Sequence, residues 1–209
     1  MEEQLKTGTT TVGIVCKDGI VLAADKRATA GTMIVDKRAE KVHIISDDFA
    51  VTIAGTVSDA QLVIKLIKAE LKLKEVRTYK VPTTKEAANL LGGILYGNLR
   101  RPSMFPSIAH FLLGGKDQEG LHLYDLFPDG SVTLIKDYVS SGSGSVFAYG
   151  VLETHYKADF PTSEGVKLAV KAVNTALQRD SASGNGVDVV VINNKDIRRV
   201  VQKELVCQL

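Results

Sequence analysis

The sequence is poor in cysteine and has no long apolar run, and each absence removes a class of protein. Among 209 residues, only Cys16 and Cys207 are cysteines, which favours two free thiols in a reducing compartment over a disulfide-stapled fold. No apolar stretch approaches the roughly 20 residues that span a bilayer, and residues 1–8 lack the apolar centre of a secretory signal. These features predict a cytoplasmic protein with no membrane partner.

A charge excess of either sign is also missing. The 26 Lys and Arg residues nearly balance the 24 Asp and Glu residues, so no strong field is present to attract nucleic acid. The length suffices for one domain with a substantial core.

Several familiar catalytic signatures are absent as well. The sequence contains no G-x-S-x-G elbow, no G-x-x-x-x-G-K-[ST] loop and no H-E-x-x-H pair. Its histidines lack the spacing of metal ligands; they are His43, His110, His122 and His155. We therefore expect structural or surface histidines and no metal.

The first quarter of the chain has the pattern of β-strands. Residues 9–16 are rich in Thr and Val, which favour strands, and Lys17-Asp18-Gly19 is typical of a hairpin turn. Residues 20–24 then predict a second strand, and residues 42–46 and 49–55 predict another hairpin.

Helices and further strands follow. Capping-box patterns at Ser58-x-x-Gln61 and Thr83-x-x-Glu86 predict two helices, the second ending near Arg101-Pro102, and residues 166–177 predict another. The remaining apolar runs predict strands at residues 109–113, 121–126, 132–138, 187–192 and 197–201. Because this order lacks regular β-α-β alternation, we expect an α+β fold in which helices cover two antiparallel sheets of one domain.

The start of the first strand is the most informative stretch for function. Residues 8–11 are Gly-Thr-Thr-Thr, which alone indicates only strand propensity. Other apolar strands begin or end beside Asp25, Lys41 and Gly55. One charged strand end can simply face solvent, but several such ends that meet one N-terminal strand indicate a site.

Six short motifs follow one another in order from Gly8 to about Ile192. They are residues 8–13 (Gly-Thr-Thr-Thr-Val-Gly), 24–29 (Ala-Asp-Lys-Arg-Ala-Thr), 40–42 (Glu-Lys-Val), 54–56 (Ala-Gly-Thr), 142–145 (Gly-Ser-Gly-Ser) with 148–153 (Ala-Tyr-Gly-Val-Leu-Glu), and 179–184 (Arg-Asp-Ser-Ala-Ser-Gly). In this order and spacing, they make the chain resemble a proteasome β subunit of archaeal type. The resemblance implies a threonine endopeptidase with the N-terminal nucleophile hydrolase fold, a four-layer αββα sandwich. It further implies that residues 1–8 are a propeptide removed by autocatalysis after Gly8, and that residues 9–209 form one peptidase domain.

The resemblance also assigns the site residues. Thr9 is implied as the nucleophile, Lys41 as the essential lysine and Asp25 as its carboxylate partner. The others are Gly55, whose N–H faces the oxyanion; Ser143, Asp180 and Ser183, a supporting network; Arg27 and Thr29, which hold an extended peptide; and Ala28, Ala39, His43, Ile53 and Val57, which line the side-chain pocket. This pocket is mostly apolar, which predicts cleavage after hydrophobic residues.

The implied chemistry explains why a leader is needed. A threonine hydroxyl is a poor nucleophile without a base, and a free α-amino group, with a pKa of about 7.7–8.0, can serve as that base. An internal threonine has only an amide nitrogen, so residues 1–8 should keep the enzyme silent until they are cut. No cofactor is required.

The resemblance implies partners too, and it leaves alternatives. The expected assembly is a homo-heptameric β ring stacked against a second β ring and between α-subunit rings, with a regulatory ATPase at the α ring and unfolded polypeptides as substrates. One alternative is a non-catalytic ring subunit, which typically lacks the threonine, the lysine or the processing glycine. Others are the bacterial ring peptidase that works with a separate ATPase, which normally begins Thr-Thr-Ile, and an α-type subunit, which has a helix before its first strand.

Overall fold

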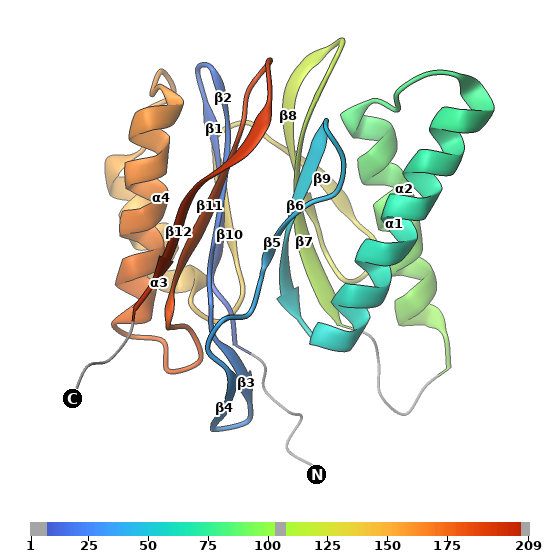
Figure 1. Ribbon diagram of the computed structural model, residues 1–209. Coiled ribbons are helices and arrows are strands. Elements are labelled where there is room, and N and C mark those ends of the chain that lie inside the picture. The colour runs from blue at the N-terminus through green and yellow to red at the C-terminus, as the bar shows by residue number, and fades with distance from the viewer. Residues whose placement is uncertain (1–7, 103–107, 206–209) are drawn as a thin grey trace.

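The computed structural model describes residues 8–102 and 108–205 and arranges them in four layers (Figure 1). Two five-stranded antiparallel sheets lie face to face in the middle. One pair of helices covers each outer sheet face (Figure 1). The predicted α+β sandwich of two antiparallel sheets flanked by helices is therefore confirmed.

The first sheet carries the N-terminal strand in its interior. Its strand order is β10-β1-β2-β11-β12, in which the strands are β10 (Tyr138–Ser141), β1 (Thr11–Cys16), β2 (Gly19–Asp25), β11 (Gly186–Ile192) and β12 (Ile197–Glu204). All residues of β2 and β11 are buried, as expected for strands covered on both faces.

The second sheet and a separate hairpin complete the strands. The sheet order is β5-β6-β7-β8-β9, with β5 (Val42–Ile44), β6 (Phe49–Gly55), β7 (Ala109–Asp117), β8 (Gly120–Leu126) and β9 (Val132–Ile135). The hairpin pairs β3 (Ala28–Ala30) with β4 (Met33–Asp36) and projects beyond the sheets (Figure 1).

The helices divide evenly between the two outer faces. Helices α1 (Val57–Thr78) and α2 (Thr84–Arg100) pack on the second sheet, while α3 (Ser145–His155) and α4 (Thr162–Leu177) pack on the first. Among the described residues, no helix is long and apolar enough to cross a membrane.

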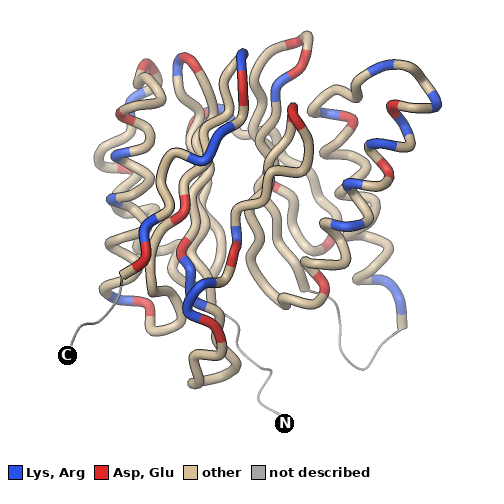
Figure 2. The backbone as a smooth tube through the Cα atoms, in the orientation of Figure 1, with Lys and Arg blue, Asp and Glu red and all other residues tan. Residues whose placement is uncertain are grey.

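The core is a stack of three apolar layers. One lies between each sheet and its helices, and the third joins the two sheets through residues such as Leu22, Leu112 and Val190, all fully buried. Charged positions gather on the helices and hairpin ends, and a few lie near the lower ends of the central strands (Figure 2). Asp25 and Lys41 of the candidate site are both buried.

Two local predictions about the helices have different outcomes. The capping box of Thr83 and Glu86 is confirmed, with reciprocal bonds between each side chain and the other backbone N–H. The capping box at Ser58 is wrong, because α1 already begins at Val57 after Thr56, which makes no side-chain capping bond. Tertiary packing of α1 on the second sheet therefore outweighs the local capping signal.

Three further elements differ from the sequence prediction. Residues 132–138 are not one strand: β9 and β10 belong to different sheets, and the chain crosses between sheets at Lys136 and Asp137. The hairpin β3–β4 and the helix α3 were not predicted. Helix α3 is short and includes Gly150, so its sequence gives a weak helical signal.

Candidate active site

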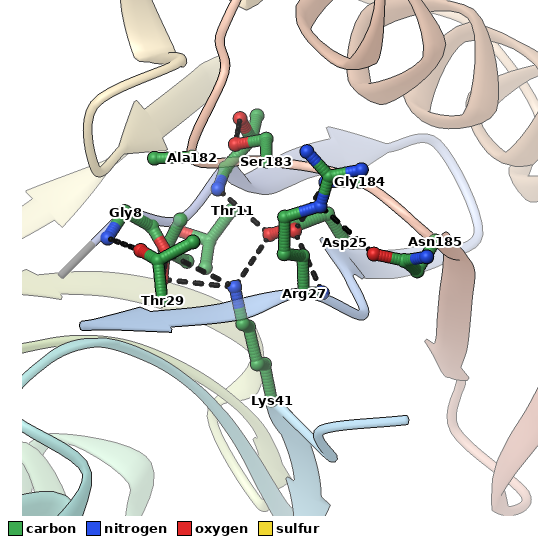
Figure 3. Close-up of polar contacts among 12 residues, drawn as sticks. Gly8, Thr11, Asp25, Arg27, Thr29, Lys41, Ala182, Ser183, Gly184 and Asn185 are labelled. Atoms are coloured by element: carbon green, nitrogen blue, oxygen red, sulfur yellow. Dashed lines mark hydrogen bonds and ion pairs between the residues drawn. The ribbon is translucent and has the colours of Figure 1, made fainter. Parts of the chain in front are cut away.

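Thr9 lies just before β1, where the first sheet faces the chain segment that leads into β5. Its residue surface is only 4% exposed. The amide hydrogen of the next residue, Thr10, bonds to Asp25 Oδ1 at 2.9 Å, so the threonine is fixed against the end of β2. Figure 3 shows this region with Gly8, Asp25 and Lys41 turned toward one another.

Asp25 is the centre of the polar contacts. It is 1% exposed and accepts hydrogen bonds on both carboxylate oxygens. Oδ1 accepts from Thr10 N at 2.9 Å and Lys41 Nζ at 2.8 Å. Oδ2 accepts from Arg27 N at 3.0 Å and Gly184 N at 2.9 Å. One carboxylate therefore joins segments that are far apart in the sequence.

Lys41 reaches the threonine hydroxyl. Its Nζ lies 3.0 Å from Thr9 Oγ1, 2.8 Å from Asp25 Oδ1 and 3.3 Å from the carbonyl oxygen of Gly8. Burial lowers the pKa of Lys41, although the charge of Asp25 opposes that shift. Burial therefore makes the neutral amine more accessible than in an exposed lysine.

A second polar network lies on the other side of Thr9. Thr9 N donates to Ser143 Oγ at 3.2 Å, and Ser143 Oγ donates to Asp180 Oδ2 at 2.6 Å. Ser183 Oγ also donates to Asp180 Oδ2 at 2.6 Å. Because the Ser183 proton is used there, Thr10 Oγ1 is the donor in its 2.7 Å contact with Ser183. The expected trio of Ser143, Asp180 and Ser183 is thus brought together beside Thr9.

Gly8 is held so tightly that no other residue fits without a shift. Its N–H donates to Thr29 Oγ1 at 3.1 Å, and its carbonyl oxygen accepts from Thr9 Oγ1 at 2.6 Å. A Cβ atom at position 8 would lie 1.7 Å from Cβ of Ala182. The glycine is therefore required by the close approach of residue 182.

Gly55 ends β6 in a conformation that favours glycine. Its φ is +113°, and a Cβ there would lie 2.2 Å from the carbonyl oxygen of Ile108. Its predicted contact with an oxyanion stays a prediction.

The predicted pocket residues come from β3, β5, β6, the start of α1 and the segment before β5, and they differ in exposure. Ala28 and Ile53 are buried, whereas Val57 at the start of α1 is 45% exposed. Ala39 N donates to the carbonyl of Lys26 at 3.0 Å, and Ile53 N donates to that of Lys41 at 2.9 Å. These bonds place Ala39 and Ile53 next to the site.

His43, the remaining pocket residue, is half-buried on β5. Burial lowers its pKa, although the charge of Glu40 opposes the shift. Its Nε2 atom is buried and has no hydrogen-bond partner among the described residues. The imidazole is therefore neutral at neutral pH, and its position adds no charge to the pocket.

The Arg27 side chain is engaged by the protein itself. Its Nε donates to Asn185 Oδ1 at 2.8 Å and its Nη1 donates to the carbonyl of Ser181 at 2.8 Å. Arg27 thus ties the loop that carries Asp180 and Ser183 to the strand end at Asp25 (Figure 3). Direct contact of Arg27 with a peptide stays a prediction.

Sequence reasoning missed two parts of the site. Thr10 contributes both its N–H and its hydroxyl, and Gly184 contributes its N–H to Asp25. The repeat of threonines at residues 9–11 masked the role of the middle one. The next residue, Asn185, has a positive φ of +64°, a conformation that asparagine adopts more readily than most residues. The asparagine at this position is the sequence signal that could have marked the loop.

Other reactive groups lie outside this arrangement. The Cys16 thiol is buried, and burial, followed by the charge of Asp18, raises its pKa to about 12. It is therefore no nucleophile at neutral pH. Cys207 lies outside the described residues. A cavity of about 920 Å³ is situated at the α1–α2 turn, lined by residues such as Tyr79, Pro82 and Lys116, and includes none of the predicted site residues.

The layered fold and the buried threonine beside a lysine–aspartate pair define the class of N-terminal nucleophile hydrolases. Comparison with known proteins narrows the class. The family profile described as "Proteasome subunit" matches residues 5–192. Relatives named "Proteasome subunit beta" are similar over nearly the whole chain: 43% identity in Ferroglobus placidus, covering 98% of this chain and 96% of the relative, and 44% in Archaeoglobus fulgidus, covering 98% and 94%. A third, in Methanocaldococcus fervens, is 43% identical and covers 95% and 87%.

The chain belongs to the proteasome subunit family and is a β subunit of archaeal type. It is accordingly a threonine protease, a peptidase of the 20S core that assembles with α subunits.

Removal of the Asp25 carboxylate should be one of the most destabilising changes in the site. In Asp25→Ala the buried Lys41 loses its counter-charge and three backbone N–H groups lose their acceptor, so the free energy of unfolding should fall by about 3–5 kcal/mol. Urea unfolding measures this loss. The loss should shrink as pH rises, because a lysine whose pKa is depressed by folding destabilises the fold less once it is neutral.

Glu75→Ala is the matched control for Asp25→Ala. It removes an exposed ion pair, in which the Lys72 side chain is 70% exposed and the Glu75 side chain 41% exposed. The free energy of unfolding should therefore fall by less than about 1 kcal/mol. Equal losses in the two variants would contradict the role given to Asp25.

Proposed function

We propose that this chain is the catalytic subunit of its particle, with Thr9 as the nucleophile once residues 1–8 have been removed. The observation that carries the proposal is the position of Lys41 Nζ, 3.0 Å from the Thr9 hydroxyl and 2.8 Å from Asp25. A structural ring subunit would have no use for a buried lysine aimed at a threonine hydroxyl. Desolvation of both charges is costly, which favours a chemical reason for keeping them.

Self-cleavage is the first reaction in this proposal. Thr9 Oγ1 attacks the carbonyl carbon of Gly8, and Lys41 Nζ takes the hydroxyl proton as the Oγ1–C bond forms. The carbonyl oxygen becomes negative beside the same Nζ, 3.3 Å away. As the C–N bond breaks, the proton held by Lys41 passes to the Thr9 nitrogen, so the acyl group moves from nitrogen to oxygen and Lys41 is neutral again. Water then hydrolyses the ester. The products are the leader with a Gly8 carboxylate and a Thr9 with a free amine.

Peptide hydrolysis repeats this chemistry with a new base. The freed amine of Thr9, next to Ser143 Oγ, takes the hydroxyl proton as Oγ1 attacks the substrate carbonyl, and later donates it to the leaving amine. When Lys41 is protonated, its positive charge lowers the pKa of this amine and favours the unprotonated form. Water then releases the acyl product. The N–H of Gly55 is proposed to stabilise the oxyanion, a type of contact worth about 10²–10³ in rate.

The proposed substrate is an extended, unfolded polypeptide that is cut after hydrophobic residues. Thr29 Oγ1 already accepts a hydrogen bond from Gly8 N, the residue on the acyl side of the leader bond. An acceptor there suits a backbone N–H of any sequence. The pocket of Ala28, Ala39, His43, Ile53 and Val57 carries no ionised side chain, which favours an apolar side chain before the cleaved bond.

The proposed assembly is a homo-heptameric β ring stacked on a second β ring, enclosed by α rings and fed by a regulatory ATPase in the cytoplasm. No cofactor takes part in the proposed chemistry. The motifs quoted for the resemblance support this arrangement.

Replacement of Thr9 tests the nucleophile. In particles assembled with the α partner, Thr9→Ala should lose peptide turnover by more than about 10³-fold while the fold and the rings persist. Thr9→Ser, which keeps a hydroxyl, should retain measurable turnover. Intact mass of the parent subunit should show a chain that begins at Thr9. A parent chain that keeps residues 1–8 in complete, active particles would contradict the proposal.

Gly8→Ala tests the tight path of the leader. Because the new Cβ would meet Ala182, the Gly8 carbonyl must move away from Thr9 Oγ1, and processing should slow by about tenfold or more. A time course of intact mass after mixing with α subunits measures the rate. The double variant Gly8→Ala/Ala182→Gly removes the meeting methyl group and should recover part of the rate, with Ala182→Gly alone as the control. Normal processing of Gly8→Ala would show that the contact does not matter.

A peptide panel tests the pocket. Fluorogenic peptides that differ only in the residue before the cleaved bond should give kcat/KM values about tenfold or more higher for Leu or Tyr than for Arg or Glu. The ratio should stay constant between about pH 7 and 8.5, because the lowered pKa of His43 keeps the imidazole neutral in that range. Preferred cleavage after Arg or Glu would overturn the assignment.

A further inference from the structure

Arg199 contacts both chain neighbours of Lys41. It projects from β12, at the edge of the first sheet, and its side chain is only 23% exposed. Its Nη2 donates to Glu40 Oε1 and also to the carbonyl oxygen of Val42, the latter at 2.9 Å. One guanidinium from the end of the chain thus holds the residues before and after the lysine.

The other side of Arg199 rests on a fixed support. Nη1 lies 3.7 Å from Asp188 Oδ2. Asp188 on β11 is 1% exposed and pairs with Lys26 Nζ, 3.2 Å from both of its carboxylate oxygens. Lys26 directly follows Asp25 in the chain. Arg199 therefore connects the segment of Lys41 to the same part of the first sheet that holds Asp25.

The segment around Lys41 has few other restraints. Strand β5 has only three residues and lies at the edge of the second sheet, and Lys41 precedes it. Besides the ladder of β5 with β6, the backbone bonds of this stretch are Ile53 N to the carbonyl of Lys41 and Ala39 N to the carbonyl of Lys26. Because edge strands make ladder bonds on one side only, the side-chain bonds from Arg199 carry an unusual share of the restraint here.

Glu40 remains an acceptor for Arg199 at any working pH. Burial would raise the pKa of Glu40, but the hydrogen bond and charge of Arg199 outweigh burial and lower it. The Glu40 side chain is 52% exposed, so the only partly buried group that loses a partner when Glu40 is removed is the Arg199 guanidinium, which keeps its bond to the Val42 carbonyl. Glu40 is therefore a suitable position for a test that spares the core.

We propose that Arg199 is a positioning residue for the reaction: it holds the Glu40 side chain and the Val42 carbonyl, one on each side of Lys41, so that Nζ stays within reach of Thr9. This inference rests on the catalytic role proposed for Lys41. Arg199 touches neither the threonine nor the substrate, so its loss should lower kcat and leave KM nearly unchanged.

Two variants with opposite charge changes separate position from electrostatics. Arg199→Ala removes a positive charge and Glu40→Ala removes a negative one, yet both break the Arg199–Glu40 contact. If Lys41 drifts from Thr9, its charge no longer depresses the pKa of the threonine amine, and the acid limb of the kcat/KM profile moves to higher pH in both variants. A purely electrostatic effect would move the limb to lower pH in Glu40→Ala.

The measurements use assembled particles and a peptide substrate. We expect kcat to fall by about tenfold in Arg199→Ala and by about threefold in Glu40→Ala, each with the acid limb displaced upward. Glu40→Gln, which keeps an acceptor oxygen, should restore the parent kcat and pH profile. Arg38→Ala is the matched control, because Arg38 also joins this segment to β12, through Glu204, but is 77% exposed; it should behave like the parent. If Arg199→Ala does not form particles, the comparison of Glu40→Ala with Glu40→Gln decides the test.

Lys41→Ala distinguishes failure of this inference from failure of the proposed function. If Lys41→Ala loses turnover while Glu40→Ala keeps the parent kcat and profile, or shifts its acid limb downward, the positioning role is wrong and the proposed function stands. If Lys41→Ala itself turns over peptide like the parent, the proposed function is wrong and the inference goes with it.

Discussion

The buried pair of Asp25 and Lys41 is the interaction on which the site depends. Two charges taken out of water must be paired and fully hydrogen-bonded, since an unpaired one costs several kcal/mol. Asp25 ends a strand of the first sheet, whereas Lys41 leads into the edge strand of the second. The pair therefore joins the two sheets where their strands end, and correct packing of the sheets is also the condition for a correct site.

Several other features follow from that pair. The loop after α4 must come close enough for Gly184 N to reach Asp25, and Arg27 holds the loop in place. The same loop carries Asp180 and Ser183 to the second polar network, so the lysine side and the serine side of Thr9 are positioned by one loop. Rigid support of this kind is what precise placement of reacting atoms requires.

The sequence predicted more of the site than of the local structure around it. Thr9, Asp25 and Lys41 lie at starts and ends of strands with a clear apolar pattern, which indicated a site, and the resemblance to proteasome β subunits implied their roles. The contacts of Thr10 and Arg199 were not predicted from the sequence. Arg199 is 158 residues from Lys41 along the chain (199 − 41 = 158), and no local pattern links the two residues. The boundary between β9 and β10 escaped for a similar reason: residues 132–138 are continuously strand-like, and only the packing of two sheets assigns their halves to different partners.

The closeness of Ala182 to Gly8 has a consequence for which residue can precede Thr9. A side chain at position 8 cannot fit beside Ala182 unless one of the two segments shifts, so the present fit is specific to glycine. The contact thus couples the choice of residue at position 8 to the placement of the loop that carries Asp180 and Ser183, because Ala182 lies between those two residues.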